Sequence, residues 1–356
     1  MTSCSREIFG HFTDGRPVHG FSLSDDSGAS VSVLEYGGIL QKIMMPDREG
    51  VFENVVLCYE DLASYLQDEH YLGAIVGRVT NRIDGGKFVL DGRTVQLSLN
   101  RGSFHQHGGF VGLSRVLWNS EVEIDESGEY LVLNTISPAG DEGYPGELRI
   151  RTEFRLAKLE LEIRMIATTD APTIINLTQH PYFNLHGNGE GDILDHDLQI
   201  NAQRFLPVNE RIIPIGEERW VTDTAFDFCQ RKTVGQDITS ADTQLELGNG
   251  FDHHWIVDGK SGVLRPAATL SDSTTGRQMN LLTTAPGVQL YTGNGLEDGS
   301  TENTSESFRR HQGLCLEPQA HPDAPNHGHF PSIVVKPGEP FTRKIIYRFT
   351  TDTDVA

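Results

Sequence analysis

The feature that most constrains this chain is a period of two in its apolar residues, with almost no helical periodicity. From Leu148 to Leu156, apolar residues and one threonine alternate with charged residues, and residues 159–164 repeat the pattern. Successive side chains of a strand point to opposite faces, so each run predicts a strand with one buried face and its charges outward. Ala157-Lys158, between the two runs, predicts a tight turn.

Turn residues extend this pattern over the whole chain. The 37 glycines and 16 prolines separate short apolar stretches, as is typical of antiparallel β proteins. Asp91-Gly92 predicts a hairpin turn, because glycine tolerates a positive φ, and Phe341 to Thr350 predicts a last strand. Leu62 and Leu66 lie four residues apart and predict a short surface helix.

No linker, repeat or low-complexity tract divides the 356 residues. We therefore predict an all-β fold, a large antiparallel β-sandwich, with residues 1–356 forming a single domain. The sequence contains no long exposed apolar element of the kind that forms a subunit interface, which favours a monomer over the alternative of a homodimer.

Charge excludes two classes of partner. The chain has 29 Lys and Arg against 50 Asp and Glu, a formal net charge of −21. Such an acidic protein repels phosphate backbones and anionic lipid, so we expect neither a nucleic acid nor a membrane as partner.

The expected cellular location rests on two kinds of segment that the sequence lacks, a secretory signal and a membrane span. Residues 1–12 contain no apolar run of the kind a secretory signal needs, and no segment approaches the length of a membrane span. We therefore expect a cytoplasmic protein. Four scattered cysteines fit this expectation as reduced thiols and small core residues: Cys4, Cys58, Cys229 and Cys315.

Several ionisable residues stand among glycine, proline or aromatic neighbours, a composition typical of loops and strand ends that face a cleft. They are Asn81-Arg82 in GRVTNRIDGG, His107 in HQHGGF, His180 in NLTQHPYFNL, Asp252 in GFDHHW and Glu317 in GLCLEPQAHPDAPN. For any single histidine of this set, the alternative is a structural imidazole that hydrogen-bonds a neighbour.

Glu317 is the sharpest candidate for acid–base chemistry. It follows the apolar residues 314–316 and precedes Pro318, which cannot continue a central ladder. A carboxylate beside a buried run holds protons more tightly than usual, which suits a general base or acid. The alternative is a partly buried salt bridge to Arg309 or Arg310.

His180 combines an imidazole with flat apolar surface. It follows a predicted strand over residues 174–178 and precedes Pro181-Tyr182-Phe183. Sugar sites use this combination, because the C–H face of a pyranose stacks on an aromatic ring while its hydroxyls take directed hydrogen bonds. A histidine and a glutamate together exchange protons near neutral pH, each contributing about 10²–10⁴-fold in rate.

Metal and nucleophilic chemistry are disfavoured. His253 and His254 are adjacent, so on a strand they point to opposite faces and cannot easily share an ion. His327 and His329 could share one, but spacing places no carboxylate beside them. The chain lacks a G-x-S-x-G elbow, an activated cysteine and a phosphate-binding glycine loop. We therefore expect no metal and no cofactor.

Taken in order, these motifs resemble those of the aldose 1-epimerase (galactose mutarotase) family. The matching segments cover most of the chain: GRVTNRIDGGKF (77–88), HGGF (107–110), DEGYPG (141–146), NLTQHPYFNL (176–185), FDHHW (251–255), PGVQLYTGN (286–294) and GLCLEPQAHPDAPN (313–326). The resemblance implies a galactose mutarotase-like supersandwich and a metal-free cleft. It also implies an isomerase of carbohydrate metabolism that interconverts the α and β anomers of a free hexose, galactose or glucose.

The resemblance also implies residue roles. Glu317 matches the general base that takes the proton of the C1 hydroxyl, His180 the general acid that protonates the ring oxygen, and His107 a second histidine near that oxygen. Residues that match sugar-hydroxyl contacts are Asn81, Arg82, Asp252 and Gln289, with Tyr182 beside His180.

Two positions depart from the family pattern. Pro181 stands where a small residue commonly follows the acid histidine, and proline stiffens that position. His105 is an extra imidazole near the predicted cleft and is the alternative to His107.

Two other functions are alternatives to the enzyme. A non-catalytic carbohydrate-binding protein on the same fold would keep Arg82 and Asp252 but lose the acid–base pair. A metal-dependent sugar enzyme would act through His327 and His329. Because Glu317 and His180 are both present, the sequence favours the epimerase.

Overall fold

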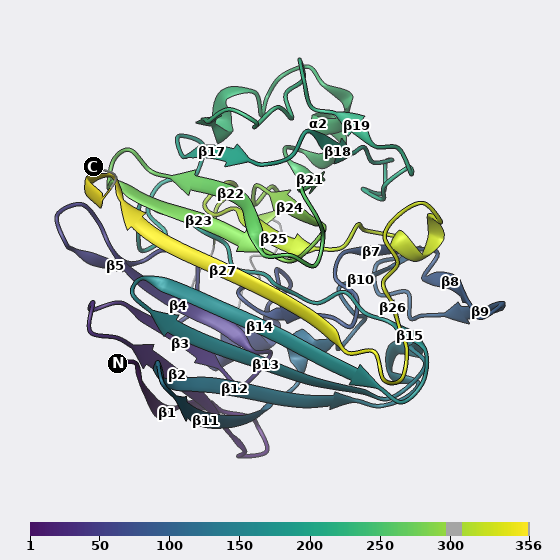
Figure 1. Ribbon diagram of the computed structural model, residues 1–356, viewed down its shortest axis with the longest axis horizontal. Coiled ribbons are helices and arrows are strands. Elements are labelled where there is room, and N and C mark those ends of the chain that lie inside the picture. The colour runs from purple at the N-terminus through teal and green to yellow at the C-terminus, as the bar shows by residue number, and fades with distance from the viewer. Residues whose placement is uncertain (297–307, 355–356) are drawn as a thin grey trace.

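Antiparallel strands dominate the computed structural model, which describes residues 1–296 and 308–354 (Figure 1). Within these residues the largest sheet has nine strands, in the order β11-β12-β13-β14-β27-β23-β22-β17-β20. The bounds are β11 (Asn119–Asp125), β12 (Gly128–Ser137), β13 (Leu148–Ala157), β14 (Glu160–Thr169), β17 (Asp197–Ile200), β20 (Lys232–Thr233), β22 (Arg265–Ser271), β23 (Arg277–Thr283) and β27 (Phe341–Thr351).

The N-terminal segment forms a second sheet with the order β1-β2-β3-β4-β5. Its strands are β1 (Ser3–His11), β2 (Pro17–Ser24), β3 (Ser30–Leu34), β4 (Ile39–Pro46) and β5 (Phe52–Asn54). Figure 1 shows this sheet behind β12, β13 and β14 as a second layer. Buried side chains of both sheets, such as Val31 and Ile43 on one and Leu133 and Phe154 on the other, belong to one apolar core cluster. The predicted all-β sandwich is confirmed.

A third sheet, which contributes several polar side chains to the candidate site, has the strand order β19-β18-β21-β24-β25. Its strands are β18 (Arg204–Leu206), β19 (Arg219–Trp220), β21 (Asp252–Ile256), β24 (Gly287–Tyr291) and β25 (Cys315–Gln319). Short strand pairs complete the β structure: β6 (Ile75–Val76) with β16 (Thr178–Gln179), β7 (Arg82–Asp84) with β10 (Phe104–Gln106), β8 (Lys87–Leu90) with β9 (Arg93–Gln96), and β15 (Thr173–Ile174) with β26 (Val334–Val335).

Helices are short in the part of the chain that the structure describes. The two α-helices are α1 (Leu62–Gln67) and α2 (Thr243–Gly248), and the 3₁₀ turns are η1 (Leu113–Arg115), η2 (Asp141–Gly143), η3 (Val234–Gln236), η5 (Ala324–Asn326) and η6 (Asp352–Asp354). Among these described helices, none is long and apolar enough to cross a membrane.

The predicted hairpins form, with one shift in register. Asp91 and Gly92 both have positive φ between β8 and β9, as the sequence predicts. The turn between β13 and β14 lies at Lys158-Leu159 and not at Ala157-Lys158, because Ala157 pairs with Glu160 in the ladder. Lys158 and Leu159 adopt positive φ, the geometry that two-residue hairpin turns require.

The predicted short helix forms as α1, and three other details need correction. The helix α1 buries Leu62 and Tyr65, three apart, whereas Leu66 is exposed. Its start is set by Asp61, whose carboxylate accepts the backbone N–H of Ser64.

The four cysteines are free thiols, but only Cys315 is a buried core residue, and the other three are half-buried. Glu153, expected to face outward into solvent, is also buried, because Arg151 and Arg155 form ion pairs with its carboxylate on the outer face of β13.

Candidate active site

The period of two in the third sheet collects polar side chains on one face. Glu317 lies opposite Gln289, and Gln289 lies opposite His254, so these three residues share a row across β25, β24 and β21. Their neighbours Leu316 and Leu290 point to the other face and into the core. Pro318 does not end the strand, because β25 is at the edge of this sheet and continues to Gln319.

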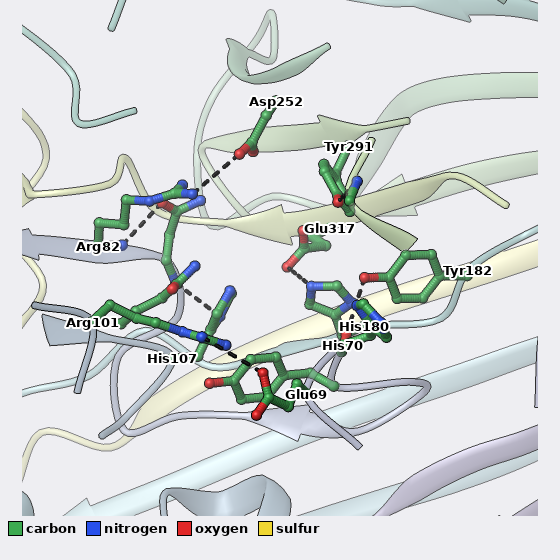
Figure 2. Close-up of a pocket in the computed structure, with 14 residues that line it drawn as sticks. Glu69, His70, Arg82, Arg101, His107, His180, Tyr182, Asp252, Tyr291 and Glu317 are labelled. Carbon is green, nitrogen blue, oxygen red and sulfur yellow. Dashed lines mark hydrogen bonds and ion pairs between the residues drawn. The ribbon is translucent and has the colours of Figure 1, made fainter. Parts of the chain in front are cut away.

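This polar face borders a cavity of about 260 Å³. Its volume is close to the lower end of the ~300–1,000 Å³ range of small-molecule sites, which suits a single small polar molecule. The lining combines residues from distant parts of the chain: Glu69, His70, Tyr71, Asn81, Arg82, Arg101, Gln106, His107, His180, Tyr182, Asp252, Tyr291, Gly295 and Glu317. All of the site residues predicted from the sequence are in this lining except Gln289 (Figure 2).

Glu317 and His180 face one another in the cavity (Figure 2). Glu317 Oε2 lies 3.6 Å from His180 Nε2, and both residues are buried. Within the described residues this oxygen accepts no hydrogen bond. A buried carboxylate oxygen without a donor is costly unless a bound molecule supplies one.

Burial shifts the pKa of both groups toward their uncharged forms. The pKa of Glu317 is raised well above its usual value, mainly by burial and then by the charge of Asp252. Burial lowers the pKa of His180 to about 4. Titratable groups whose environments push their pKa values apart in this way are typical of acid–base sites.

Among the residues that it describes, the structure does not contain the salt bridge from Glu317 to Arg309 or Arg310 that the sequence left as an alternative. Arg309 and Arg310 are exposed, and the guanidinium of Arg310 donates to the carbonyl of Asn249. The partner that the fold brings to Glu317 is His180.

The backbone fixes His180 at the end of β16. Its N–H donates to the carbonyl of Ala74, and its own carbonyl accepts the N–H of Gly73. Both bonds extend the pairing of β16 with β6, so the chain is held extended on both sides of the imidazole. Pro181 follows His180 and has no backbone N–H, but neither of these two hydrogen bonds uses the N–H of residue 181.

His107 lines the cavity with a defined tautomer. The backbone N–H of Asn81 donates to His107 Nδ1 over 3.3 Å, and the N–H of His107 donates back to the carbonyl of Asn81. Burial lowers the pKa of His107 well below its usual value, so the ring is neutral and carries its proton on Nε2. His107 is therefore a hydrogen-bond donor at Nε2.

A glycine holds this turn in place. A Cβ on Gly108, which has φ +89°, would lie 1.7 Å from the carbonyl oxygen of Gly77. The close approach of the two backbones leaves room only for glycine.

His105 does not compete for this position. It is fully buried outside the lining of the cavity, where its ring hydrogen-bonds the hydroxyl of Tyr144 and the carbonyl of Ser98. Alternation along β10 separates it from Gln106, which does line the cavity. Of the two histidines weighed in the sequence, the fold brings His107 to the cavity.

Across the cavity from His180, Arg82 and Asp252 form an ion pair (Figure 2). Arg82 Nη2 donates to Asp252 Oδ2 over 3.2 Å, and Gln289 Nε2 donates to Asp252 Oδ1 over 2.7 Å. Gln319 Nε2 in turn donates to Gln289 Oε1 over 3.4 Å. Gln289, predicted to contact sugar hydroxyls, thus lies one layer behind the lining and holds the carboxylate of Asp252.

Aromatic rings form one wall of the cavity. Tyr182 packs against His180 with ring centroids 5.2 Å apart, and its hydroxyl donates to the carbonyl of His70. Tyr71 lies 4.6 Å from the ring of His107. Tyr291 lies beside Tyr182, at 6.0 Å.

Several lining residues were not predicted from the sequence. Glu69, His70, Tyr71 and Arg101 come from loops around α1 and β10, and Figure 2 shows Arg101 directed toward Glu69. Arg101 Nη1 and Glu69 Oε2 are 3.9 Å apart and both side chains are exposed. These residues carry no local motif. For Tyr291, its place two residues after Gln289 on the same strand face was a usable signal.

Histidines outside the cavity have other partners. His327 Nε2 lies 3.3 Å from a carboxylate oxygen of Asp323, and His329 Nε2 donates to the carbonyl of Gly216. Neither lines the cavity. His253 packs on Phe226, whereas His254 Nε2 lies 3.0 Å from His321 Nδ1, so the adjacent pair faces two ways as predicted.

One group of possible metal ligands occurs in the part of the chain that the structure describes: His186, Asp195 and His196. His196 Nε2 accepts the backbone N–H of Leu185, which places the proton of the neutral ring on Nδ1, facing the carboxylate of Asp195 at 3.2 Å. Hydrogen bonds account for this group, because the nitrogen that faces Asp195 holds a proton and not a lone pair.

The cavity can bind a polyhydroxylated molecule and move protons on it. Arg82 and Asp252, at one end of the cavity, are charged and can form charge-assisted hydrogen bonds with the hydroxyls of such a molecule. Glu317 and His180 at the other end form an acid–base pair, with His107 as a neutral donor beside them.

Comparison with known proteins supplies the relatives of this chain. A model of the family described as aldose 1-epimerase matches residues 20–348. Galactose mutarotase from Bos taurus is 38% identical over 98% of this chain and 99% of its own length, and aldose 1-epimerase from Escherichia coli K12 is 32% identical over 95% and 97%. The crystal structure of galactose 1-epimerase from Lactobacillus acidophilus NCFM superposes with a TM-score of 0.87, at 30% identity and 99% coverage of both chains.

Proposed function

The chain belongs to the aldose 1-epimerase family, and on this premise we propose that its cavity opens and recloses the ring of a free hexose. The reaction interconverts the α and β anomers of the sugar, so the protein is an isomerase. The observation that carries this proposal is the Glu317–His180 pair in the cavity lining, a buried carboxylate oxygen that has no hydrogen bond within the described residues and lies 3.6 Å from an imidazole nitrogen.

Ring opening needs two coordinated proton transfers. Glu317, as carboxylate, takes the proton of the C1 hydroxyl while His180, as imidazolium, delivers its Nε2 proton to the ring oxygen, and the C1–O5 bond breaks to give the open-chain aldehyde. Rotation about C1–C2 presents the other face of the carbonyl, and the reverse transfers close the ring to the second anomer.

The pKa shifts favour the state of the pair that ring opening produces. Both favour a pair that holds one proton, as carboxylic acid and neutral imidazole, over the pair of opposite charges. Ring opening therefore starts from the less favoured carboxylate and imidazolium, and it leaves the two groups in the favoured state, with the proton of the C1 hydroxyl on Glu317 and His180 as neutral imidazole. To the Nε2–H of His107, whose Nδ1 accepts from Asn81, we assign a hydrogen bond to the ring oxygen as charge develops there.

The binding half of the cavity must grip both anomers. We assign this role to Asn81, Arg82 and Asp252, which hold hydroxyls away from C1, with Tyr182 and Tyr71 as apolar surface beside the ring. Gln289 supports Asp252 from behind. No residue of this set needs a metal ion or a cofactor for its role.

We propose galactose as the preferred substrate, because relatives that match nearly the whole chain are named for it. Polarimetry on freshly dissolved α-D-galactose and α-D-glucose tests both the activity and the preference. The chain is expected to speed the approach to anomeric equilibrium over the buffer rate, and more so for galactose. A rate equal to that of the heat-unfolded chain on both sugars would contradict the activity.

Loss of that activity would favour the second candidate, a carbohydrate-binding protein without catalysis. The binding half of the cavity suits it equally well, but it gives no reason for a buried carboxylate and imidazole at 3.6 Å. Equilibrium binding of galactose without acceleration of mutarotation is the result that would select it.

For location and assembly we propose a cytoplasmic monomer. Four free thiols support the reducing compartment, since oxidising compartments favour disulfides. Light scattering at several protein concentrations tests the assembly, and a mass of twice 39.4 kDa would contradict it in favour of a homodimer.

A further inference from the structure

The acid histidine is held between two residues of one strand. Cys315 precedes Glu317 by two positions in β25, so both side chains lie on the same face. The Sγ of Cys315 lies 3.5 Å from His180 Nδ1, while Glu317 Oε2 lies 3.6 Å from His180 Nε2. Within the described residues, the thiol is the hydrogen-bond partner of Nδ1.

The thiol is enclosed and chemically quiet. Cys315 has no exposed surface and packs in an apolar cluster that includes Leu57 and Tyr182. Burial, followed by the charge of Glu317, raises the pKa of Cys315 well above its usual value, so the group remains S–H. It therefore offers both a weak donor and a weak acceptor.

This partner suits a ring that must change its protonation state in each cycle. Nδ1 keeps its proton while Nε2 gives one up and regains it, so the thiol sulfur accepts a hydrogen bond from Nδ1–H in both states of the ring. A carboxylate at Nδ1 would bind the imidazolium strongly and make the proton harder to release. Sulfur holds the ring with little preference for either state.

We propose that Cys315 is a positioning residue, which orients the imidazole of His180 through Nδ1 and keeps its Nε2 proton labile. This inference rests on the proposed function and deepens it, since it concerns how the acid of that reaction works. In the alternative, Cys315 only fills space among apolar neighbours.

Two substitutions and a matched control separate these roles. Cys315→Ala removes the hydrogen bond, and Cys315→Ser restores a group that donates and accepts. Cys229→Ala is the control, because its half-buried thiol contacts the carbonyl of Ala202 away from the cavity. Each variant is assayed by polarimetry for kcat and KM, over a range of pH, with thermal unfolding measured in parallel.

The positioning role predicts a specific pattern. Cys315→Ala lowers kcat by about 3- to 10-fold with KM nearly unchanged, which corresponds to the loss of one ordinary hydrogen bond that stabilises the transition state. Cys315→Ser recovers most of the lost turnover, and Cys229→Ala turns over as fast as the unsubstituted chain. Nitrogen NMR of the labelled histidines shows a changed Nδ1 signal for His180 in Cys315→Ala.

Other patterns overturn the inference. They are an unchanged kcat and Nδ1 signal in Cys315→Ala, or equal losses in the alanine and serine variants that follow their thermal stability. If Cys315→Ala does not fold, Cys315→Ser carries the test alone. A hydroxyl oxygen accepts a stronger hydrogen bond than sulfur, so the acid limb of its pH profile must move upward, and an unmoved limb rejects the role.

The two proposals fail in different ways. An unsubstituted chain without mutarotase activity removes the proposed function, whatever the variants do. Activity in the unsubstituted chain, with Cys315→Ala behaving like Cys229→Ala, removes only the positioning role.

Discussion

Gln289 offers the clearest contrast between a sugar contact and a supporting residue. The structure places its Nε2 2.7 Å from Asp252 Oδ1 and leaves it out of the cavity lining. Removing the amide in Gln289→Ala therefore acts on the sugar through Asp252 alone. Arg82 still holds the other carboxylate oxygen, so Asp252 stays in place but with more freedom.

The size of the effect follows from this geometry. A hydrogen bond to a charged group contributes ~1.5–3 kcal/mol, and the remaining Arg82 bond favours the lower figure. About 1.5 kcal/mol corresponds to roughly a tenfold loss in kcat/KM. Because the role assigned to Asp252 is to bind hydroxyls away from C1 in both anomers and in the open chain, we expect the loss in KM with kcat nearly unchanged.

Initial-rate polarimetry over a range of galactose concentrations measures both parameters. Gln289→Glu sharpens the test, since a second carboxylate beside Asp252 repels it and should raise KM further than alanine does. If Gln289→Ala instead lowered kcat by about a hundredfold or more at constant KM, this reasoning would be refuted, because a loss of that size would place Gln289 at the reacting atoms.

Three further predictions concern pH, metal and stability. The pH dependence of kcat/KM should be bell-shaped, because activity falls near pH 4 when the Glu317–His180 pair takes up a second proton, and falls again above the usual glutamate range when the pair loses its one proton. A profile with a single rising limb would contradict this. Activity should survive excess chelator, and a loss that added metal restores would contradict the roles assigned here. Arg78→Leu should lower the free energy of unfolding by about 3 kcal/mol or more, because the buried guanidinium donates to the carbonyls of Ser137, Pro138, Pro145 and Gly146; denaturant unfolding measures it, and a change below about 1 kcal/mol would show that water replaces these bonds.

The sequence predicted the strands well where one face is buried and the other is charged. The run from Leu148 to Leu156 lies within β13 because its alternation has one solution, with Ile150 and Phe154 in the core. The turn that follows was misplaced by one residue, since Lys158 and Leu159 give no glycine or asparagine signal for their positive φ.

The site was predictable to the extent that its residues stand in recognisable motifs. Glu317, His180, His107 and Arg82 do, and they meet at one cavity. Tyr71 and Arg101 reach it from loops whose position depends on packing of the whole fold, which no local pattern encodes. Gln289, a sugar-hydroxyl contact by the family resemblance alone, lies outside the cavity lining and donates to Asp252, because a motif gives the identity of a residue and not the reach of its side chain.

The central claim is that Glu317 transfers a proton in a mutarotase reaction, and polarimetry of the unsubstituted chain against Glu317→Gln tests it most directly. The amide keeps the size of the side chain and removes its basicity. We predict that the unsubstituted chain accelerates α-D-galactose mutarotation and that the variant turns over about 10²–10⁴-fold more slowly, with galactose still bound. Equal kcat values for the two chains would contradict it.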